Sequence, residues 1–204
     1  MHMADALVSP PVATGMAVAS LAVGAYSIFK IKKENKPENI PVMGVMGAFV
    51  FATQMVNFTI PGTGSSGHLC GGLLLSALIG PYGGFLSMMA ILLLQCLLFA
   101  DGGLMAYGCN VWNMAFYACF FGYFCIYKPI LGKNPSKKKI LIASILGSVL
   151  SLQLGAFSVT LETLISGVTE LPFLTFLSFM QPIHLAIGFV EGLITSAVLI
   201  FVYN

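Results

Sequence analysis

The sequence predicts an all-α integral membrane protein, a bundle of about seven transmembrane helices with its N-terminus outside the cell and its C-terminus inside. Of its 204 residues, 58% are hydrophobic and only 8% are charged, whereas roughly a quarter of a soluble domain is charged. The apolar stretches are continuous rather than alternating, which favours helices over barrel strands. The chain has room for roughly six to eight crossings, in a single domain over residues 1–204.

Seven apolar segments account for the predicted helices. The first follows a Ser-Pro-Pro sequence, which is typical of a helix start. The expected bounds are 12–31, 42–58, 69–79, 85–99, 111–127, 140–165 and 182–203. The break at 80–84, Gly-Pro-Tyr-Gly-Gly, is expected to be a tight turn. The opening residues lack the basic region of a signal peptide.

The basic residues indicate how the bundle is oriented. All nine are lysines, and they fall in two connections between apolar segments: Lys30, Lys32, Lys33 and Lys36, then Lys128, Lys133, Lys137, Lys138 and Lys139. Lysine-rich loops between membrane helices usually lie in the cytoplasm, so we do not interpret these clusters as nucleic-acid patches. Four crossings separate the two clusters and put both on one side, which places the N-terminus outside.

Residues with metal-binding chemistry fall at the opposite end. In this topology His2, His68 and His184 all lie toward the outer surface. A free terminal amine, the amide nitrogen between residues 1 and 2, and the His2 imidazole can close adjacent chelate rings on one metal. Planar nitrogen donors suit Ni(II) or Cu(II). His68 ends a glycine-rich segment, PGTGSSGH, whose flexibility would let it supply the fourth donor.

This spacing is not specific by itself. A histidine at position 2, or at a membrane interface, more often has no metal role. The five cysteines form no CxxC pair, and most lie in apolar stretches, where thiols usually pack as small hydrophobic groups.

Four linked motifs strengthen the hypothesis. They are MHMADALVSPP at the start, PGTGSSGHLCGG at 61–72, LLLQCLLFADGGLMAYGCNVWNM at 92–114 and HLAIGFVEGLITSAV at 184–198. Together they resemble the nickel/cobalt substrate-binding membrane component (S component, NikM/CbiM type) of energy-coupling factor (ECF) transporters. The resemblance extends over nearly the whole chain. The family often has Ile at position 3 and Gly after the Asp, where this chain has Met3 and Ala6; the proposed donors are unchanged.

The resemblance implies a function and a site. It implies a seven-helix bundle in the cell membrane of a prokaryote that captures Ni(2+) or Co(2+) from outside, with an N-terminal loop (1–9) entering the bundle. The implied ligands are the Met1 amine, the backbone and imidazole nitrogens of His2, and His68. Metal-ligating histidines usually need a partner that orients them. The candidates for that role are Asn57, Ser66, Asp101, Asn110 and His184.

The implied partners are the ECF ATPase subunits, the transmembrane coupling (T) protein, the lipid bilayer and often a small accessory membrane subunit. We expect the transported metal to be the only ligand. We expect no cofactor, and no nucleic acid as a partner. The chain contains no GxxxxGK[ST] phosphate-binding loop, so ATP hydrolysis is left to partners and the chain is not expected to be an enzyme.

Two other classes compete with this interpretation. A self-sufficient secondary carrier or channel would need several ionisable residues along its helices, and only Glu162 and Glu191 qualify. An intramembrane metalloprotease would need HExxH or a similar pair, which is missing. Glu191 itself could be a packing hydrogen-bond partner or a functional group.

Overall fold

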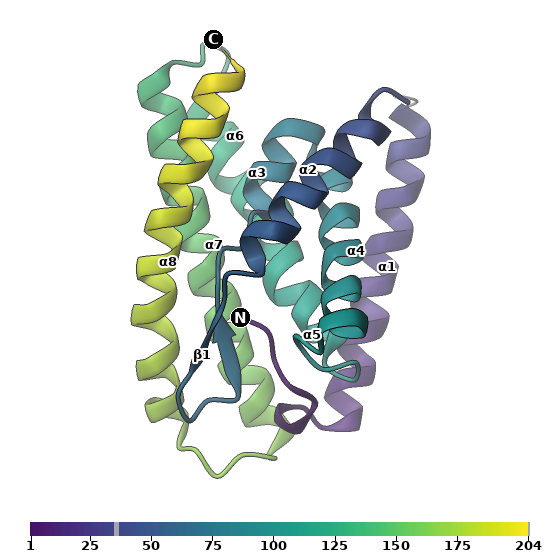
Figure 1. Ribbon diagram of the computed structural model, residues 1–204, viewed down its shortest axis with the longest axis vertical. Coiled ribbons are helices and arrows are strands. Elements are labelled where there is room, and N and C mark those ends of the chain that lie inside the picture. The colour runs from purple at the N-terminus through teal and green to yellow at the C-terminus, as the bar shows by residue number, and fades with distance from the viewer. Residues whose placement is uncertain (35–36, 204) are drawn as a thin grey trace.

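The computed structural model describes residues 1–34 and 37–203 and consists of a helical bundle with one small hairpin (Figure 1). Five spans are long and apolar enough to cross a membrane: α1 (Pro10–Glu34), α4 (Pro81–Phe99), the continuous span Tyr107–Leu131, α7 (Lys137–Ser166) and α8 (Phe173–Val202). Two shorter helices, α2 (Asn39–Gln54) and α3 (Gly72–Ile79), complete the bundle. The predicted all-α membrane fold is confirmed.

The span Tyr107–Leu131 has three parts. It consists of α5 (Tyr107–Asn110), η2 (Val111–Tyr127) and α6 (Lys128–Leu131). Through η2 the backbone follows the i→i+5 hydrogen bonding of a π-helix, a pattern usually confined to a single turn. A short 3-10 turn, η1 (Asp5–Leu7), precedes α1.

The last helix begins earlier than predicted. The sequence predicted a start at Pro182 and a connection over 166–181, but α8 already begins at Phe173 and continues through Pro182. A neighbouring helix can supply polar partners where proline interrupts a membrane helix. Here Gln153 of α7 donates to the Gln181 carbonyl (2.9 Å), and Gln181 donates back to the Gln153 carbonyl (3.2 Å).

The segment before α3 also differs from the prediction. We expected helix up to Phe58 and a new helix from Leu69, but α2 ends at Gln54 and α3 begins at Gly72. Between them β1 (Phe58–Ile60) pairs antiparallel with β2 (Ser65–Gly67). Gly62 and Gly64, in the hairpin turn, have φ of 73° and 65°, which glycine adopts without steric cost. The predicted turn at 80–84 shrinks to Gly80, after which Pro81 opens α4.

Helices α7 and α8 are in backbone contact. A Cβ added at Gly188 would lie 2.8 Å from Cα of Val149, and one at Gly192 would lie still closer to Cα of Ile145. Two glycines four residues apart form the small-xxx-small pattern that allows membrane helices to approach closely. This helix pair forms one wall of the bundle.

The two ends of the bundle have different connections. The end of α1, the start of α2 and the α6–α7 loop lie at the end that also holds the C-terminus, whereas the hairpin and the α7–α8 loop lie at the other end (Figure 1). Lysine-bearing connections therefore share one end, as the parity argument requires; Lys36 lies outside the described residues. That this end faces the cytoplasm remains a prediction.

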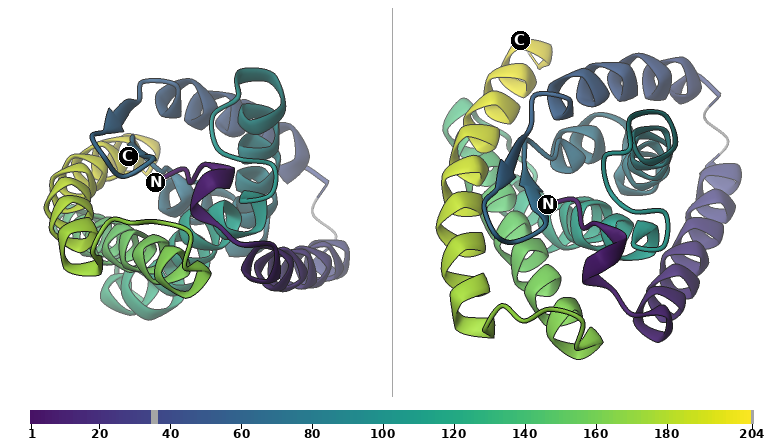
Figure 2. Two further views of the ribbon diagram at one scale, coloured as in Figure 1. Left: turned by 90° about the horizontal axis from the view of Figure 1, so that it is seen from below. Right: turned by 60° about the horizontal axis from the view of Figure 1, so that its bottom comes forward.

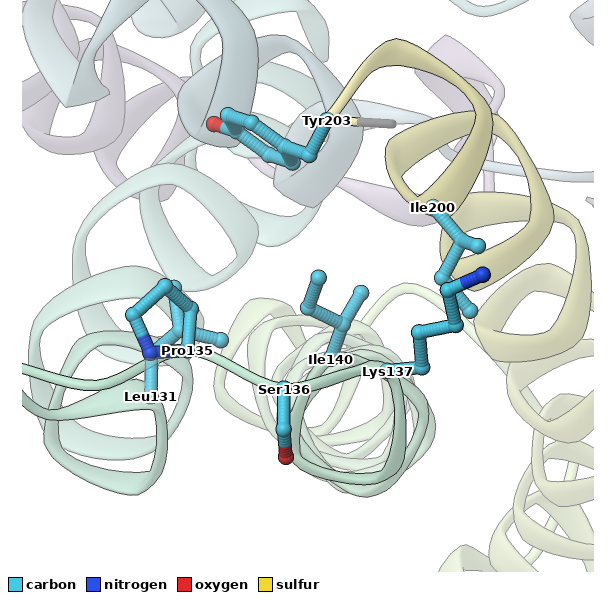
Figure 3. A pocket seen from close by; sticks show the side chains of 7 residues that line it. All are labelled: Leu131, Pro135, Ser136, Lys137, Ile140, Ile200 and Tyr203. Atoms are coloured by element: carbon cyan, nitrogen blue, oxygen red, sulfur yellow. The ribbon is translucent and has the colours of Figure 1, made fainter.

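A pocket of about 410 Å³ lies at the lysine-bearing end, between α6, α7 and the end of α8 (Figure 3). It is lined by Leu131, Pro135, Ser136, Lys137, Ile140, Ile200 and Tyr203. This lining contains no imidazole, thiol or carboxylate side chain, so it is a poor match for a transition metal.

Candidate metal centre

The first three residues are buried inside the bundle, between the hairpin and the helices (Figure 2). Met1, His2 and Met3 are only 2%, 3% and 0% exposed. Asn110 of α5 anchors this segment: its Oδ1 accepts from the Met3 N–H (2.7 Å) and its Nδ2 donates to the Met3 carbonyl (3.2 Å). Met3 also pairs with Ser65 of β2 as an antiparallel bridge. A single bridge thus joins the N-terminal segment to the edge of the hairpin.

The terminal amine lies in this interior. It donates to the Ser66 carbonyl (2.5 Å), and the Ser66 N–H donates to the His2 carbonyl (3.3 Å). Ser66 therefore acts through its backbone and not through its hydroxyl. Burial lowers the pKa of the Met1 amine to about 5, so the amine is uncharged at neutral pH and has a lone pair.

His2 and His68 lie against each other. Their ring centroids are 4.6 Å apart and the rings are stacked at 26°. Nδ1 of His68 is 2.7 Å from the Leu69 carbonyl oxygen, so Nδ1 carries the proton and the Nε2 lone pair is free. This Nε2 has no hydrogen-bond partner within the described chain. Burial lowers the pKa of His68 well below its usual value.

Asp101 and Asn57 hold the other side of His2. Nδ1 of His2 is 3.1 Å from Oδ1 of Asp101, and Asn57 donates to Oδ2 of the same carboxylate (2.7 Å). Burial acts to raise the pKa of Asp101, but the neighbouring His2 ring and the hydrogen bond from Asn57 outweigh it and the pKa is lowered. Burial also lowers the pKa of His2. A neutral imidazole is thus held beside an ionised carboxylate.

His184 is buried in α8. Its Nδ1 is 2.7 Å from the Met180 carbonyl of its own helix, and no partner is found for its Nε2 among residues 1–34 and 37–203. Asn57, Ser66, Asp101 and Asn110 thus lie around the N-terminal segment, directly or through one another, whereas no hydrogen bond in the described chain joins His184 to it.

The side chains alone do not complete a metal site. In the described parts of the chain, no three His, Cys, Asp or Glu side chains are arranged to hold a metal ion. The buried amine and backbone nitrogens are thus the donors that could supplement the two imidazoles. An open cleft of about 270 Å³ adjoins them, lined by His2, Asp5, Ser65, Asp101 and neighbouring loop residues, and gives access from the hairpin end.

Two residues beside the candidate metal centre, Gln95 and Asp5, were not among the predicted site residues. Gln95 of α4 is fully buried beside His2, and a glutamine inside the apolar run LLLQCLLF was a visible signal. Asp5 accepts from the Ala106 N–H (3.0 Å) and so ties the loop before α5 to the N-terminal segment. The residues around Asp5 in the sequence gave no indication of this contact.

Fold and site together define a multi-pass membrane protein with a buried, nitrogen-rich site built on its own N-terminus. The family model of CbiM, described as the cobalt uptake substrate-specific transmembrane region, matches residues 2–204. The chain belongs to this family, and the resemblance inferred from the four motifs is confirmed.

Curated relatives and solved structures agree with the assignment. A putative fused nickel transport protein NikMN from Archaeoglobus fulgidus is 36% identical over 99% of this chain and 65% of the relative. A cobalt transport protein CbiM from Acetoanaerobium sticklandii is 32% identical over 100% of this chain and 83% of the relative. The crystal structure of a transition metal transporter superposes with a TM-score of 0.89 at 31% identity, covering 100% of this chain and 92% of that chain. The chain spans about two thirds of the length of the Archaeoglobus relative.

Proposed function

We propose that this chain is the substrate-capture component of an ATP-driven ECF-type importer and binds Ni(2+) or Co(2+) at the Met1 amine, His2 and His68. One observation carries the proposal: a buried amine and two stacked imidazoles meet in the interior, with the Nε2 lone pair of His68 unpartnered in the described chain. Burying such groups without partners is unfavourable, and a metal ion would satisfy them together.

The proposed donors fit a planar ion. The amine and the His2 amide nitrogen close one chelate ring, and the His2 amide and Nδ1 close the next, which leaves one position for Nε2 of His68. In this structure Nδ1 of His2 faces Asp101, so chelation requires the His2 ring to rotate. Nitrogen donors in a plane favour Ni(II) over Co(II) in intrinsic affinity.

Partners would supply the energy. The sequence has no phosphate-binding loop, and its two intramembrane carboxylates, Glu162 and Glu191, are engaged by neighbouring elements rather than forming a continuous path. Relatives named as fused nickel transport proteins are longer than this chain. We therefore assign capture to this chain, and ATP hydrolysis and coupling to ATPase subunits, a T protein and an accessory membrane subunit.

Moving the amine tests the chelate. One glycine added before Met1 shifts the amine by a full residue, so Ni(II) binding by the purified chain should be largely lost. Isothermal titration and the absorption spectrum of bound Ni(II) measure this, after intact mass has confirmed a free Met1 in the parent. The same glycine added at the C-terminus is the control and should have no effect. Equal binding by both extended chains would rule out the amine as a ligand.

Transport by the isolated chain tests the division of labour. Proteoliposomes containing only this chain, given external Ni(2+) or Co(2+), should bind metal in proportion to protein and should not accumulate it. The measurement is retained metal over time, with and without an imposed proton or sodium gradient. Gradient-driven accumulation would instead identify a secondary carrier.

A further inference from the structure

Glu191 is a carboxylate buried in the middle of α8, with a side chain 3% exposed. Its two oxygens both accept hydrogen bonds from the segment that links β2 to α3. Oε2 accepts from the Cys70 N–H (2.5 Å) and Oε1 from the Gly71 N–H (3.1 Å). The carboxylate therefore holds two successive backbone donors that begin only two residues after His68.

Other elements hold the same two residues from other sides. Gln54 of α2 donates to the Cys70 carbonyl (2.5 Å), and the Cys70 thiol donates to the Met114 carbonyl of η2 (3.3 Å). Gly71 has φ of 77°, and a Cβ there would lie 2.6 Å from Cγ1 of Val50. Hydrogen bonds from α8, α2 and η2 thus fix Cys70–Gly71 in position.

This fixed segment leads directly to the imidazole of His68. The Leu69 carbonyl precedes the Cys70 N–H in the same peptide group, and it accepts from Nδ1 of His68 (2.7 Å). Holding that peptide plane therefore holds the carbonyl that selects the His68 tautomer. Partners that orient a metal-ligating histidine in this way commonly affect affinity by about 10–100-fold.

We infer that Glu191 is a positioning residue for metal binding: by holding the Cys70 and Gly71 N–H groups, it fixes the Leu69 carbonyl and with it the orientation of His68. This inference rests on the proposed function of His68 as a ligand. A carboxylate at the start of α3 also stabilises that helix through its terminal N–H groups. The test must therefore separate a stabilising role from one exerted through His68.

A double-mutant cycle makes that separation. Glu191→Gln in the full-length chain keeps the side-chain size but replaces one acceptor with an amide donor, so Ni(II) affinity should fall by about 10–100-fold. The spectrum of the remaining bound Ni(II) should come to resemble that of His68→Ala. In the His68→Ala background, Glu191→Gln should change the residual affinity by no more than about twofold, because the imidazole through which Glu191 acts is already gone; effects of independent sites would instead add.

Ser196→Ala is the matched control on the same helix. Its hydroxyl is also buried but bonds only within α8, to the Leu193 carbonyl (2.8 Å), so parental affinity and spectrum are expected. Thermal unfolding without metal checks that each chain is folded. If Glu191→Gln does not fold, Glu191→Asp is judged by the same criteria, since it keeps the charge but shortens the reach.

The outcomes distinguish the two proposals. If the parent chain binds no Ni(II), that result contradicts the proposed function itself rather than the positioning role of Glu191 alone. Where the parent binds and His68→Ala weakens binding, a Glu191→Gln chain with parental affinity overturns the inference. An equal loss in both backgrounds overturns it as well, because the effect would then not pass through His68.

Discussion

The properties of the candidate ligands depend on single backbone groups beside them. The Leu69 carbonyl decides which nitrogen of His68 carries the proton, and the Ser66 carbonyl receives the Met1 amine. Neither interaction involves the side chain of the partner residue. Substituting Ser66 would therefore leave its contact with the amine in place, whereas the carboxamide of Asn110 is itself the group that binds Met3.

Asn110→Ala tests that anchor. It removes both hydrogen bonds to Met3 and leaves a buried N–H without its partner, which costs about 1–3 kcal/mol. We expect a lower melting temperature and weaker Ni(II) binding, because the N-terminal segment is less firmly held. Asn134→Ala, at an exposed loop position, is the control. Identical melting and binding for the two variants would mean that Asn110 does not anchor the segment.

The candidate ligands and several of the residues around them could be named from the sequence, but the contacts that join them could not. His2 and His68 were recognisable from residue type, spacing and resemblance, because metal chemistry restricts which side chains serve. Hydrogen bonds such as Asn57 to Asp101 join residues 44 positions apart, so no local pattern reveals them. The contacts of Ser66 are backbone contacts, on which its residue type has little influence.

At the scale of elements, apolar runs predicted the helices but not all of their ends. The apolar stretch 173–181 belongs to α8, which continues through Pro182 and is joined there to α7 by the reciprocal Gln153–Gln181 hydrogen bonds. This tertiary contact joins residues 28 positions apart, so no local pattern reveals it. The hairpin escaped prediction because its strands have only three residues each. The N-terminal segment pairs with β2 at Ser65, a contact between residues far apart in the sequence. Such short strands leave almost no periodicity in a sequence.

For the whole molecule, the distribution of lysine predicts which end faces the cytoplasm. Thr59 in the hairpin and Ser136 in the α6–α7 loop are both exposed and lie at opposite ends. With exposed Cys125 replaced by Ser, a membrane-impermeant maleimide should label Thr59→Cys in intact cells. It should label Ser136→Cys only after permeabilisation. Labelling of both variants in intact cells would refute the orientation, and the Cys125→Ser parent measures the background.

The contact between α7 and α8 limits how this bundle can move. At Gly188 and Gly192 the two backbones interlock, and sliding one helix past the other would drive Val149 and Ile145 into bulkier neighbours on α8. Closely packed surfaces of this kind resist gradual shear and change, if at all, in discrete steps. We therefore expect α7 and α8 to rotate together as one rigid body. Since α8 carries Glu191, whose carboxylate accepts from the Cys70 and Gly71 N–H groups, any rotation of this pair relative to α3 would displace the peptide beside His68.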